Sequence, residues 1–274
     1  MPNGLGMKRK CTLLLFVATP AEEDALEQTV KDRFGLPYER IVDDLLGEYH
    51  WIGDIGNETV MAIRPARDRG QVVMGQIGRL GSAARGIRFR DVTGASGIVQ
   101  LGMGFGIDPH KQNLGDVLVS TSLIPYDNRL IGTSSPQPSG ALYSTDYSPA
   151  VRQPARPALV DLFRRAQRRD GSRKFEVHFG AILSAAARIH SRHFRDELIV
   201  GVPGGDDDIV GGEMEGVGLL AATTLADDPV WCVVKGISDF ADENRGDVID
   251  ASRPIACRNA AEFVLAALVN NVNA

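Results

Sequence analysis

One stretch of the chain, residues 211–242, restricts the fold more than any other. It reads GGEMEGVGLLAATTLADDPVWCVVKGISDFAD: an acidic entry, small residues suited to a helix, and an apolar run that ends in acidic residues. The run at 230–237 has the continuous apolar character of a strand buried on both faces, which favours an α/β sheet. In open sheets of this class, ligands bind beyond the carboxyl ends of the strands. Asp239 and Asp242 are therefore expected beside a ligand crevice.

Length and composition fit one enzyme-sized domain. The chain has 274 residues, of which 43% are hydrophobic and 24% charged, and these values are ordinary for a globular protein. The formal net charge of -5 argues against a nucleic-acid polymer as partner, because binding to phosphate backbones needs a basic surface. We expect a single domain over residues 1–274, with a loose tail at 1–10.

The cysteines and the apolar runs of the sequence indicate the cellular compartment of the protein. Cys11, Cys232 and Cys257 are odd in number and widely spaced. This usage is typical of reduced core thiols and not of a disulfide framework, so we expect a cytoplasmic protein. No apolar run approaches the length that crosses a bilayer, and the short run at 11–18 leads into acidic residues without a cleavage site. We therefore expect no membrane partner.

The rest of the chain alternates strands and helices. The apolar run at 12–17 predicts a central strand, and Thr19-Pro20 predicts the start of a helix over 21–33. Alternation at 47–55 and 58–63 around Gly56-Asn57 predicts an antiparallel hairpin, which makes the sheet mixed. Further strands are expected at 71–75, 97–107, 116–124 and 177–184, further helices from 83, at 158–169 and at 251–269, and a long, weakly structured loop at 125–157.

The strand at 97–107 is expected to enter a glycine-rich turn at 102–106. The spacing of these glycines is that of a dinucleotide-binding turn, but such a turn needs a helix to follow it, and here Pro109 and another strand follow. We expect no dinucleotide cofactor. His190 and His193 lie at helical spacing without a third ligand nearby, so we expect no metal either.

Two motifs, EMEG at 213–216 and VKGISDFAD at 234–242, resemble the purine nucleoside phosphorylase and methylthioadenosine (S-adenosylhomocysteine) nucleosidase superfamily. The resemblance implies an α/β three-layer sandwich with a central mixed β-sheet, and cleavage of the bond between a ribose and a base. It also implies a homo-oligomer, a dimer or larger, that needs no cofactor. Further landmarks of the family match in order at 18–22, 75–84, 102–107, 115–120 and 180–184.

The resemblance assigns roles to individual residues. Asp239 matches the acid that protonates or hydrogen-bonds N7 of a purine, and Ser238 orients it. Glu215 matches the carboxylate that grips the ribose hydroxyls, with Met214 under the sugar. Glu22 matches the acid that orients the attacking water, with Glu23 as the alternative should the alignment shift by one position. The other candidates for substrate contact are Glu213, Gly102, Met103, Gly104, Ile189, Arg188 and Arg79.

Each carboxylate also has a purely structural alternative. A helix N-terminus favours an anion without any ligand, so Glu213 is expected to be a structural cap, and Glu22 alone would be an ordinary first-turn glutamate. Only the pairing of Glu215 with the strand end at 238–239 favours a functional role for that glutamate.

The nucleophile is indicated by the residues before the glycine-rich turn. Phosphate-using relatives carry an arginine there, followed by Gly and Ser or Thr, because a phosphate dianion needs a charge-assisted partner. This chain has Gln100 and Met103 at those places. Water is therefore the expected nucleophile, and a phosphorylase that uses Arg79 or Arg64 as its anion site is the alternative.

Two departures from the family concern the substrate. Phe105 replaces a small residue and would narrow the sugar site, and Arg188 stands near a position that is commonly apolar or aromatic. Arg188 would stack on a purine, meet a substrate phosphate together with Arg79 and Lys111, or point to solvent. The leading hypothesis is a purine nucleoside or nucleotide N-ribohydrolase. A phosphorylase and a catalytically silent nucleotide-sensing module are the alternatives.

Overall fold

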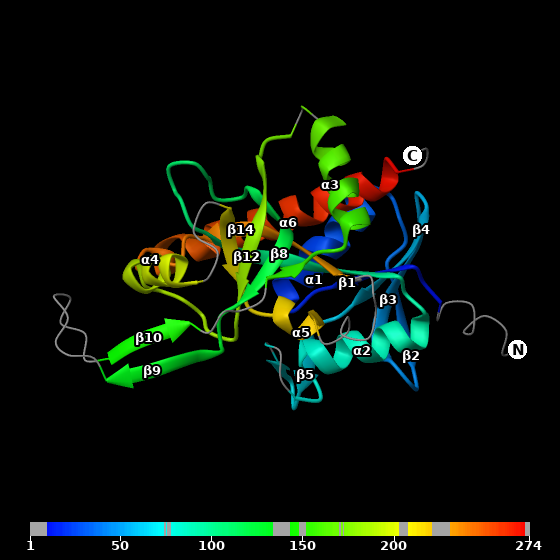
Figure 1. Cartoon of the computed structure of the whole chain (residues 1–274). Coiled ribbons are helices and arrows are strands. Elements are labelled where there is room, and N and C mark those ends of the chain that lie inside the picture. Colours follow the sequence, from blue (N-terminus) through cyan, green and yellow to red (C-terminus); the bar gives the residue numbers. More distant parts are fainter. Residues whose placement is uncertain are drawn as a thin grey trace, which may run out of the picture.

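The computed structural model has strands through its middle and helices on both sides of them (Figure 1). The structure describes residues 10–73, 75, 78–133, 143–147, 152–169, 171, 173–202, 208–220 and 231–271. The expected tail lies outside the described residues except for Lys10, and so do parts of the expected loop at 125–157 and the segment 221–230.

A single mixed sheet organises the described chain. Its strands are β1 (Leu13–Phe16), β2 (Glu39–Asp43), β3 (Gly47–Ile55), β4 (Glu58–Ile63), β7 (Gly97–Gly106), β8 (Val117–Pro125), β11 (Gln153–Pro154), β12 (Val177–Ser184), β13 (Ile209–Glu213) and β14 (Trp231–Asp239). They pair in the order β11-β8-β12-β13-β7-β1-β4-β3-β2, and β14 pairs with both β7 and β8. Because β1 is parallel to β4 and β7 while β3 is antiparallel to β2 and β4, the expected mixed sheet is confirmed.

Two short antiparallel ribbons lie outside this sheet. They are β5 (Ala66–Asp68) with β6 (Gln71–Val73), and β9 (Arg129–Thr133) with β10 (Tyr143–Tyr147). The β9–β10 ribbon projects from the body of the molecule (Figure 1). The segment 125–157, expected to be weakly structured, thus contributes β9, β10 and β11, and that part of the expectation was wrong.

Helices cover both faces of the sheet. They are α1 (Pro20–Gln28), continued by the π-helical turn η2 (Thr29–Arg33), α2 (Ser82–Thr93), α3 (Pro157–Arg169), α4 (Arg192–Gly201), α5 (Gly216–Leu220) and α6 (Arg245–Val269). The last helix begins before the expected residue 251, and Pro254 lies inside it.

The side chains of β1 show why the fold has three layers. Successive side chains of a strand point to opposite faces of the sheet. Leu13 and Leu15 belong to the core that includes α3 and α6 residues, whereas Leu14 and Phe16 belong to the core that includes Phe89 of α2. Both faces of the central strand are therefore buried, which confirms the three-layer sandwich.

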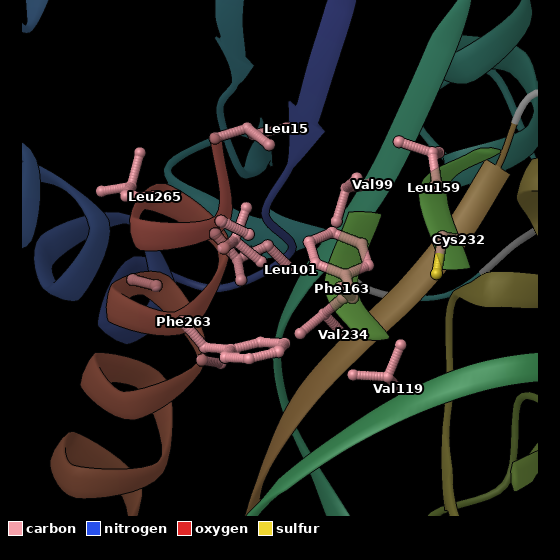
Figure 2. Close-up of a cluster of buried hydrophobic side chains, with 14 of the residues drawn as sticks. Leu15, Val99, Leu101, Val119, Leu159, Phe163, Cys232, Val234, Phe263 and Leu265 are labelled. Atoms are coloured by element: carbon pink, nitrogen blue, oxygen red, sulfur yellow. The ribbon is translucent and has the colours of Figure 1, made fainter. Parts of the chain in front are cut away.

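The core between the sheet and α6 is built from large apolar side chains. Phe263 of α6 and Phe163 of α3 lie with their ring centroids 5.7 Å apart. Figure 2 shows both rings beside Leu101 and Val234 of the adjacent strands β7 and β14. Packing of this kind fixes the strand ends that carry the site. No helix in the described part of the chain is both long enough and apolar enough to cross a membrane.

Two expectations about local structure were wrong in a way that bears on the site. The glycines at 102–106 do not form a turn, because β7 continues through them to Gly106. Glu213 does not lie in a loop that leads into a helix, as its position predicts, because it is the last residue of β13 and pairs in register with Ser184 of β12. Both segments approach the site as extended backbone.

Candidate active site

A pocket lies where β1, β7, β12, β13 and β14 reach their carboxyl ends. Its empty volume is about 580 Å³ with the open mouth included, which is the size of a small-ligand site. Most of the residues that the sequence singled out are in its wall: Glu22, Met103, Gly104, Arg188, Ile189, Glu213, Met214, Glu215, Ser238 and Asp239.

Two of the candidate substrate contacts are not in the wall of this pocket, and neither is Asp242, which was expected beside the crevice. Gly102 lies behind the Glu22 side chain, and Arg79 is exposed on the segment that leads to α2. Lys111, a candidate for a phosphate contact, is also outside the wall and pairs with Asp108 at 3.3 Å. The wall is completed by residues outside the set of candidate site residues: Thr19, Phe105, Ala187, Gly212 and Arg245.

Glu22 is fixed at the floor of the pocket by the start of α1. Thr19 caps the helix, and its backbone N–H donates in turn to Glu22 Oε2 at 2.9 Å, which completes a capping box. The N–H of Ala18 donates to the same oxygen at 2.8 Å, and Met103 N–H donates to Oε1 at 2.9 Å. The carboxylate is only 3% exposed, so these donors offset the cost of burying its charge.

The adjacent Glu23 is committed elsewhere. Its Oε1 accepts from Arg64 Nε at 2.6 Å, and Arg64 also pairs with Glu48. Neither Glu23 nor Arg64 is in the pocket wall. The structure thus places Glu22, and not its alternative, at the site, and it leaves Arg64 engaged away from it.

The glycines of β7 make room for this arrangement. Gly102 has a φ of +151°, and a Cβ there would lie 1.8 Å from Glu22 Oε1. A Cβ at Gly104 would lie 2.7 Å from the carbonyl oxygen of Gly212. Since neither distance leaves space for an atom, the glycine spacing is explained by close packing of a carboxylate and a strand against β7.

Glu215 faces the pocket from the junction between β13 and α5. Both oxygens of Glu213 accept from the backbone N–H of Gly216 at 2.9 Å, and Oε2 also accepts from Glu215 N–H at 2.9 Å. Ser82 Oγ donates to the carbonyl oxygen of Glu215 at 2.7 Å. Glu213 is therefore the structural cap that its sequence position predicts, and its bonds orient Glu215.

Lys235 is the main residue that the sequence reading missed. Its side chain is 1% exposed, and Nζ lies 3.6 Å from Glu22 Oε1 and 3.7 Å from Glu215 Oε2. A lysine inside the apolar run of β14 was the available signal, because a buried ammonium needs carboxylate partners.

The buried charges of Glu22, Glu215 and Lys235 change the pKa values of Glu215 and Lys235. Burial raises the pKa of Glu215 to about 7, although the Lys235 ammonium opposes the shift. Burial alone would lower the pKa of Lys235, but the carboxylates of Glu22 and Glu215 outweigh it and raise that pKa. Lys235 is therefore protonated at neutral pH and lies between the two glutamates.

Asp239 lines the pocket from the last residue of β14. Its Oδ2 accepts from Ser238 Oγ at 2.9 Å, and its Oδ1 accepts from Ala241 N–H at 2.9 Å. Ser238 Oγ also lies 3.0 Å from the carbonyl oxygen of Gly104. Arg245 Nε, from the first residue of α6, is 3.3 Å from Asp239 Oδ2. The carboxyl group is thus oriented on three sides.

Phe105 lines the pocket without closing it. The ring packs against the backbone of Gly212, where a Cβ would lie 2.2 Å from the ring. Gln100, at the position that carries an arginine in phosphate-using relatives, is fully buried and absent from the wall. The pocket therefore has no counterpart of that arginine at Gln100.

Comparison with known proteins agrees with this architecture. The chain is 26% identical over 227 residues to a death domain-containing ATP nucleosidase of Amphimedon queenslandica, which covers 78% of this chain but only 40% of that relative. A 5'-methylthioadenosine/S-adenosylhomocysteine nucleosidase of Neisseria meningitidis, solved with methylthio-immucillin-A, superposes with a TM-score of 0.69 at 16% identity over 94% of this chain and 99% of that one.

A futalosine hydrolase of Helicobacter pylori superposes with a TM-score of 0.65 at 17% identity, over 96% of this chain and 98% of that one. The identities of these two structures are low, so they bear on the fold alone. The model of the phosphorylase superfamily matches residues 12–269, which is nearly the whole described chain. On this match and on the sheet that presents Glu22, Glu215 and Asp239 to one pocket, the chain belongs to the phosphorylase superfamily.

Proposed function

We propose that the protein is a purine nucleoside or nucleotide N-ribohydrolase, which cleaves the N-glycosidic bond and releases the free base. The observation that carries the proposal is the placement of Glu22, Glu215 and Asp239 in the wall of one pocket. The name of the sequence relative, an ATP nucleosidase, supports the proposal and brings nucleotides into the substrate class.

The proposed reaction breaks the bond between C1' of the ribose and N9 of the purine. The bonding electrons leave with the base, and positive charge builds up on the sugar as in other glycoside cleavages. Asp239 gives a proton or a hydrogen bond to N7, so that the base departs neutral, and Ser238 holds the carboxyl group in place. Glu215 grips the ribose hydroxyls, and Met214 lies under the sugar.

Water completes the reaction at C1'. Glu22 orients the water molecule and accepts its proton, while the hydroxyl oxygen bonds to C1'. The backbone of Met103 and Gly104 lines this part of the pocket, and Met103 N–H donates to Glu22. Lys235 balances the charges of Glu22 and Glu215 from behind the wall. Products are the free base and the ribose or its 5' derivative.

The charges on this side of the pocket favour water over phosphate. A phosphate dianion beside Glu22 would face a buried carboxylate, and like charges in a buried site repel. Gln100 offers no cation in place of the arginine of phosphate-using relatives. Hydrolysis is therefore the proposed reaction. Phosphorolysis is the alternative that the experiment must distinguish from it.

The proposed reaction is tested by assaying a set of substrates with the wild type and with a variant of the proposed acid, Asp239. Release of free base is followed from adenosine, methylthioadenosine, adenosylhomocysteine, AMP and ATP, with and without phosphate, for the wild type and Asp239→Asn. We expect release that is independent of phosphate and is lost in the variant. Release that requires phosphate, with ribose 1-phosphate as product, would identify a phosphorylase. Binding without release from any compound would favour the nucleotide-sensing module.

The proposal extends to the setting of the enzyme. We propose a single-domain unit over residues 1–274 that works in the cytoplasm, with Cys11, Cys232 and Cys257 as buried free thiols. We also propose a homo-oligomer, because the projecting β9–β10 ribbon exposes the apolar side chains of Leu130 and Ile131. Sedimentation of the purified chain tests the assembly.

A further inference from the structure

Most charges in the pocket wall are already neutralised by contacts within the protein. Glu22 and Glu213 accept backbone N–H groups, and Glu22 and Glu215 share Lys235. These groups form the floor, where a ribose would lie under the proposed function. The two positive groups in the wall, Arg188 and Arg245, are not engaged to the same degree.

Arg188 carries a charge without a partner. It lies on the segment between β12 and α4, it is exposed, and it lines the pocket. Its guanidinium forms no hydrogen bond or ion pair with any other residue that the structure describes. An arginine has five N–H donors in a planar fork, which suits it to a bidentate contact with phosphate.

Arg245 is only partly engaged. Its side chain is 15% exposed, and its Nε contacts Asp239 Oδ2 at 3.3 Å. That oxygen already accepts from Ser238 Oγ at 2.9 Å, so the contact is long and shared. Within the described chain, the two Nη groups of Arg245 donate to no other residue. A half-buried guanidinium with unused donors is an incomplete site for an anion.

We propose that the pocket takes a phosphorylated purine nucleoside, and that Arg188 and Arg245 bind its phosphate groups. The proposal rests on the proposed function and deepens it, because it selects nucleotides over nucleosides. An uncharged nucleoside would leave both guanidinium groups without an anion. A phosphate dianion offers each of them charge-assisted hydrogen bonds that are stronger than the shared contact to Asp239.

The position of Arg245 couples phosphate binding to the acid. In the free enzyme its guanidinium contacts Asp239, and in the complex it turns to the phosphate. Asp239 then keeps Ser238 and Ala241 as its donors and meets the base without an adjacent cation. Arg245 acts as a positioning residue for Asp239 as well as a phosphate ligand, whereas Arg188 contacts the phosphate alone.

The experiment compares AMP, ATP and adenosine as substrates for the wild type, Arg188→Ala and Arg245→Ala in phosphate-free buffer. For the wild type we expect kcat/KM to be at least about 10-fold higher with the nucleotides than with adenosine. Arg188→Ala should lower kcat/KM for nucleotides by about 10-fold or more, mainly through KM, and leave adenosine nearly unchanged. Arg245→Ala should also change kcat, because it touches Asp239.

The matched control is Arg192→Ala, which removes an exposed arginine four positions along that is not in the pocket wall. It should leave all three substrates unchanged. Equal kcat/KM for AMP and adenosine in the wild type, or equal losses for both in Arg188→Ala, would overturn the proposal. Release of base from nucleosides without a nucleotide preference would still support the N-ribohydrolase, whereas no release from any substrate would refute both.

One further set of reactions distinguishes a site for free inorganic phosphate from a site for the phosphate ester of a nucleotide. Inorganic phosphate is added to the AMP and adenosine reactions of the wild type and Arg188→Ala. We expect it to compete with AMP in the wild type and to compete less in the variant, without formation of ribose 1-phosphate. Formation of ribose 1-phosphate would show that the anion site holds a nucleophile and would overturn the assignment.

Discussion

Glu22 occupies the space that a side chain at residue 102 would need. A Cβ on Gly102 would lie 1.8 Å from Glu22 Oε1, and the φ of Gly102 is +151°. A carboxylate from the first helix is thus packed directly onto the backbone of β7. The position of the proposed base depends on a glycine at this place, and this gives the first prediction.

Gly102→Ala should displace the Glu22 carboxylate and reduce base release by roughly 100-fold or more, because a small misplacement of a reacting group is costly. The backbone conformation adds a loss of unfolding free energy of about 1–3 kcal/mol. Steady-state assays and denaturant unfolding measure the two effects. Gly171→Ala is the control, since a Cβ there meets nothing within 4 Å. Full activity in Gly102→Ala would contradict the geometry.

Lys235→Met should destabilise the protein in a way that depends on pH. Removal of one partner from a buried ion pair costs about 3–5 kcal/mol, because Glu22 and Glu215 would face each other without a cation. The loss should be smaller at pH 5 than at pH 8, since protonation of Glu215 relieves the repulsion. Lys235→Arg keeps the charge and should lose less. Denaturant unfolding curves at pH 5 and pH 8 measure the loss of unfolding free energy. An equal loss at both pH values would indicate that Lys235 stabilises the fold through packing alone.

Glu215→Gln should become more stable relative to the wild type as the pH rises. The pKa of Glu215 is raised by burial from 4.5 to about 7, so the folded state binds its proton more tightly than the unfolded state. This contribution to stability is full below pH 4.5 and is lost as the pH rises through about 7. The loss is roughly 3 kcal/mol. A stability difference between the variant and the wild type that is constant from pH 4.5 to 8 would rule this out.

Glu213→Ala should weaken both the fold and the site. The carboxylate accepts the N–H groups of Glu215 and Gly216, and removal of an acceptor from buried donors costs about 1–3 kcal/mol. Because Glu215 loses its orientation, kcat/KM should fall by roughly 10-fold. Glu213→Gln keeps one acceptor oxygen and should lie between the variant and the wild type. Circular dichroism melts with parallel assays measure both effects, and an unaffected Glu213→Ala would show that the cap is dispensable.

Much of the site could be predicted from sequence because its residues lie at the ends of recognisable elements. Asp239 ends an apolar strand and is expected beside the crevice for that reason, whereas Glu22 is predicted by the family resemblance, because a first-turn glutamate alone indicates only a cap. Lys235 and Arg245 could not be placed this way. Lys235 interrupts an apolar run without any local sign of its partners, which come from distant segments, and Arg245 becomes a wall residue only because α6 begins earlier than its apolar pattern indicates.

The elements of the fold also divide into those that the local sequence predicts and those that tertiary contacts decide. The central strands, the hairpin at 47–63 and the capped helix α1 follow from local pattern and turn chemistry. The glycines of β7 predict a turn and form a strand instead, because glycine permits turns and extended strands alike. What decides between them is the tertiary contact of Glu22 and Gly212 with β7, which no local pattern contains.

The most direct test of the account is base release in phosphate-free buffer by the wild type and Glu22→Gln, with adenosine and AMP as substrates and the sugar product identified. We expect free base and a hydrolysed sugar from the wild type, and a fall in kcat of at least about 100-fold in the variant because a general base is lost. Undiminished turnover by Glu22→Gln, or release by the wild type only after phosphate is added, would contradict it.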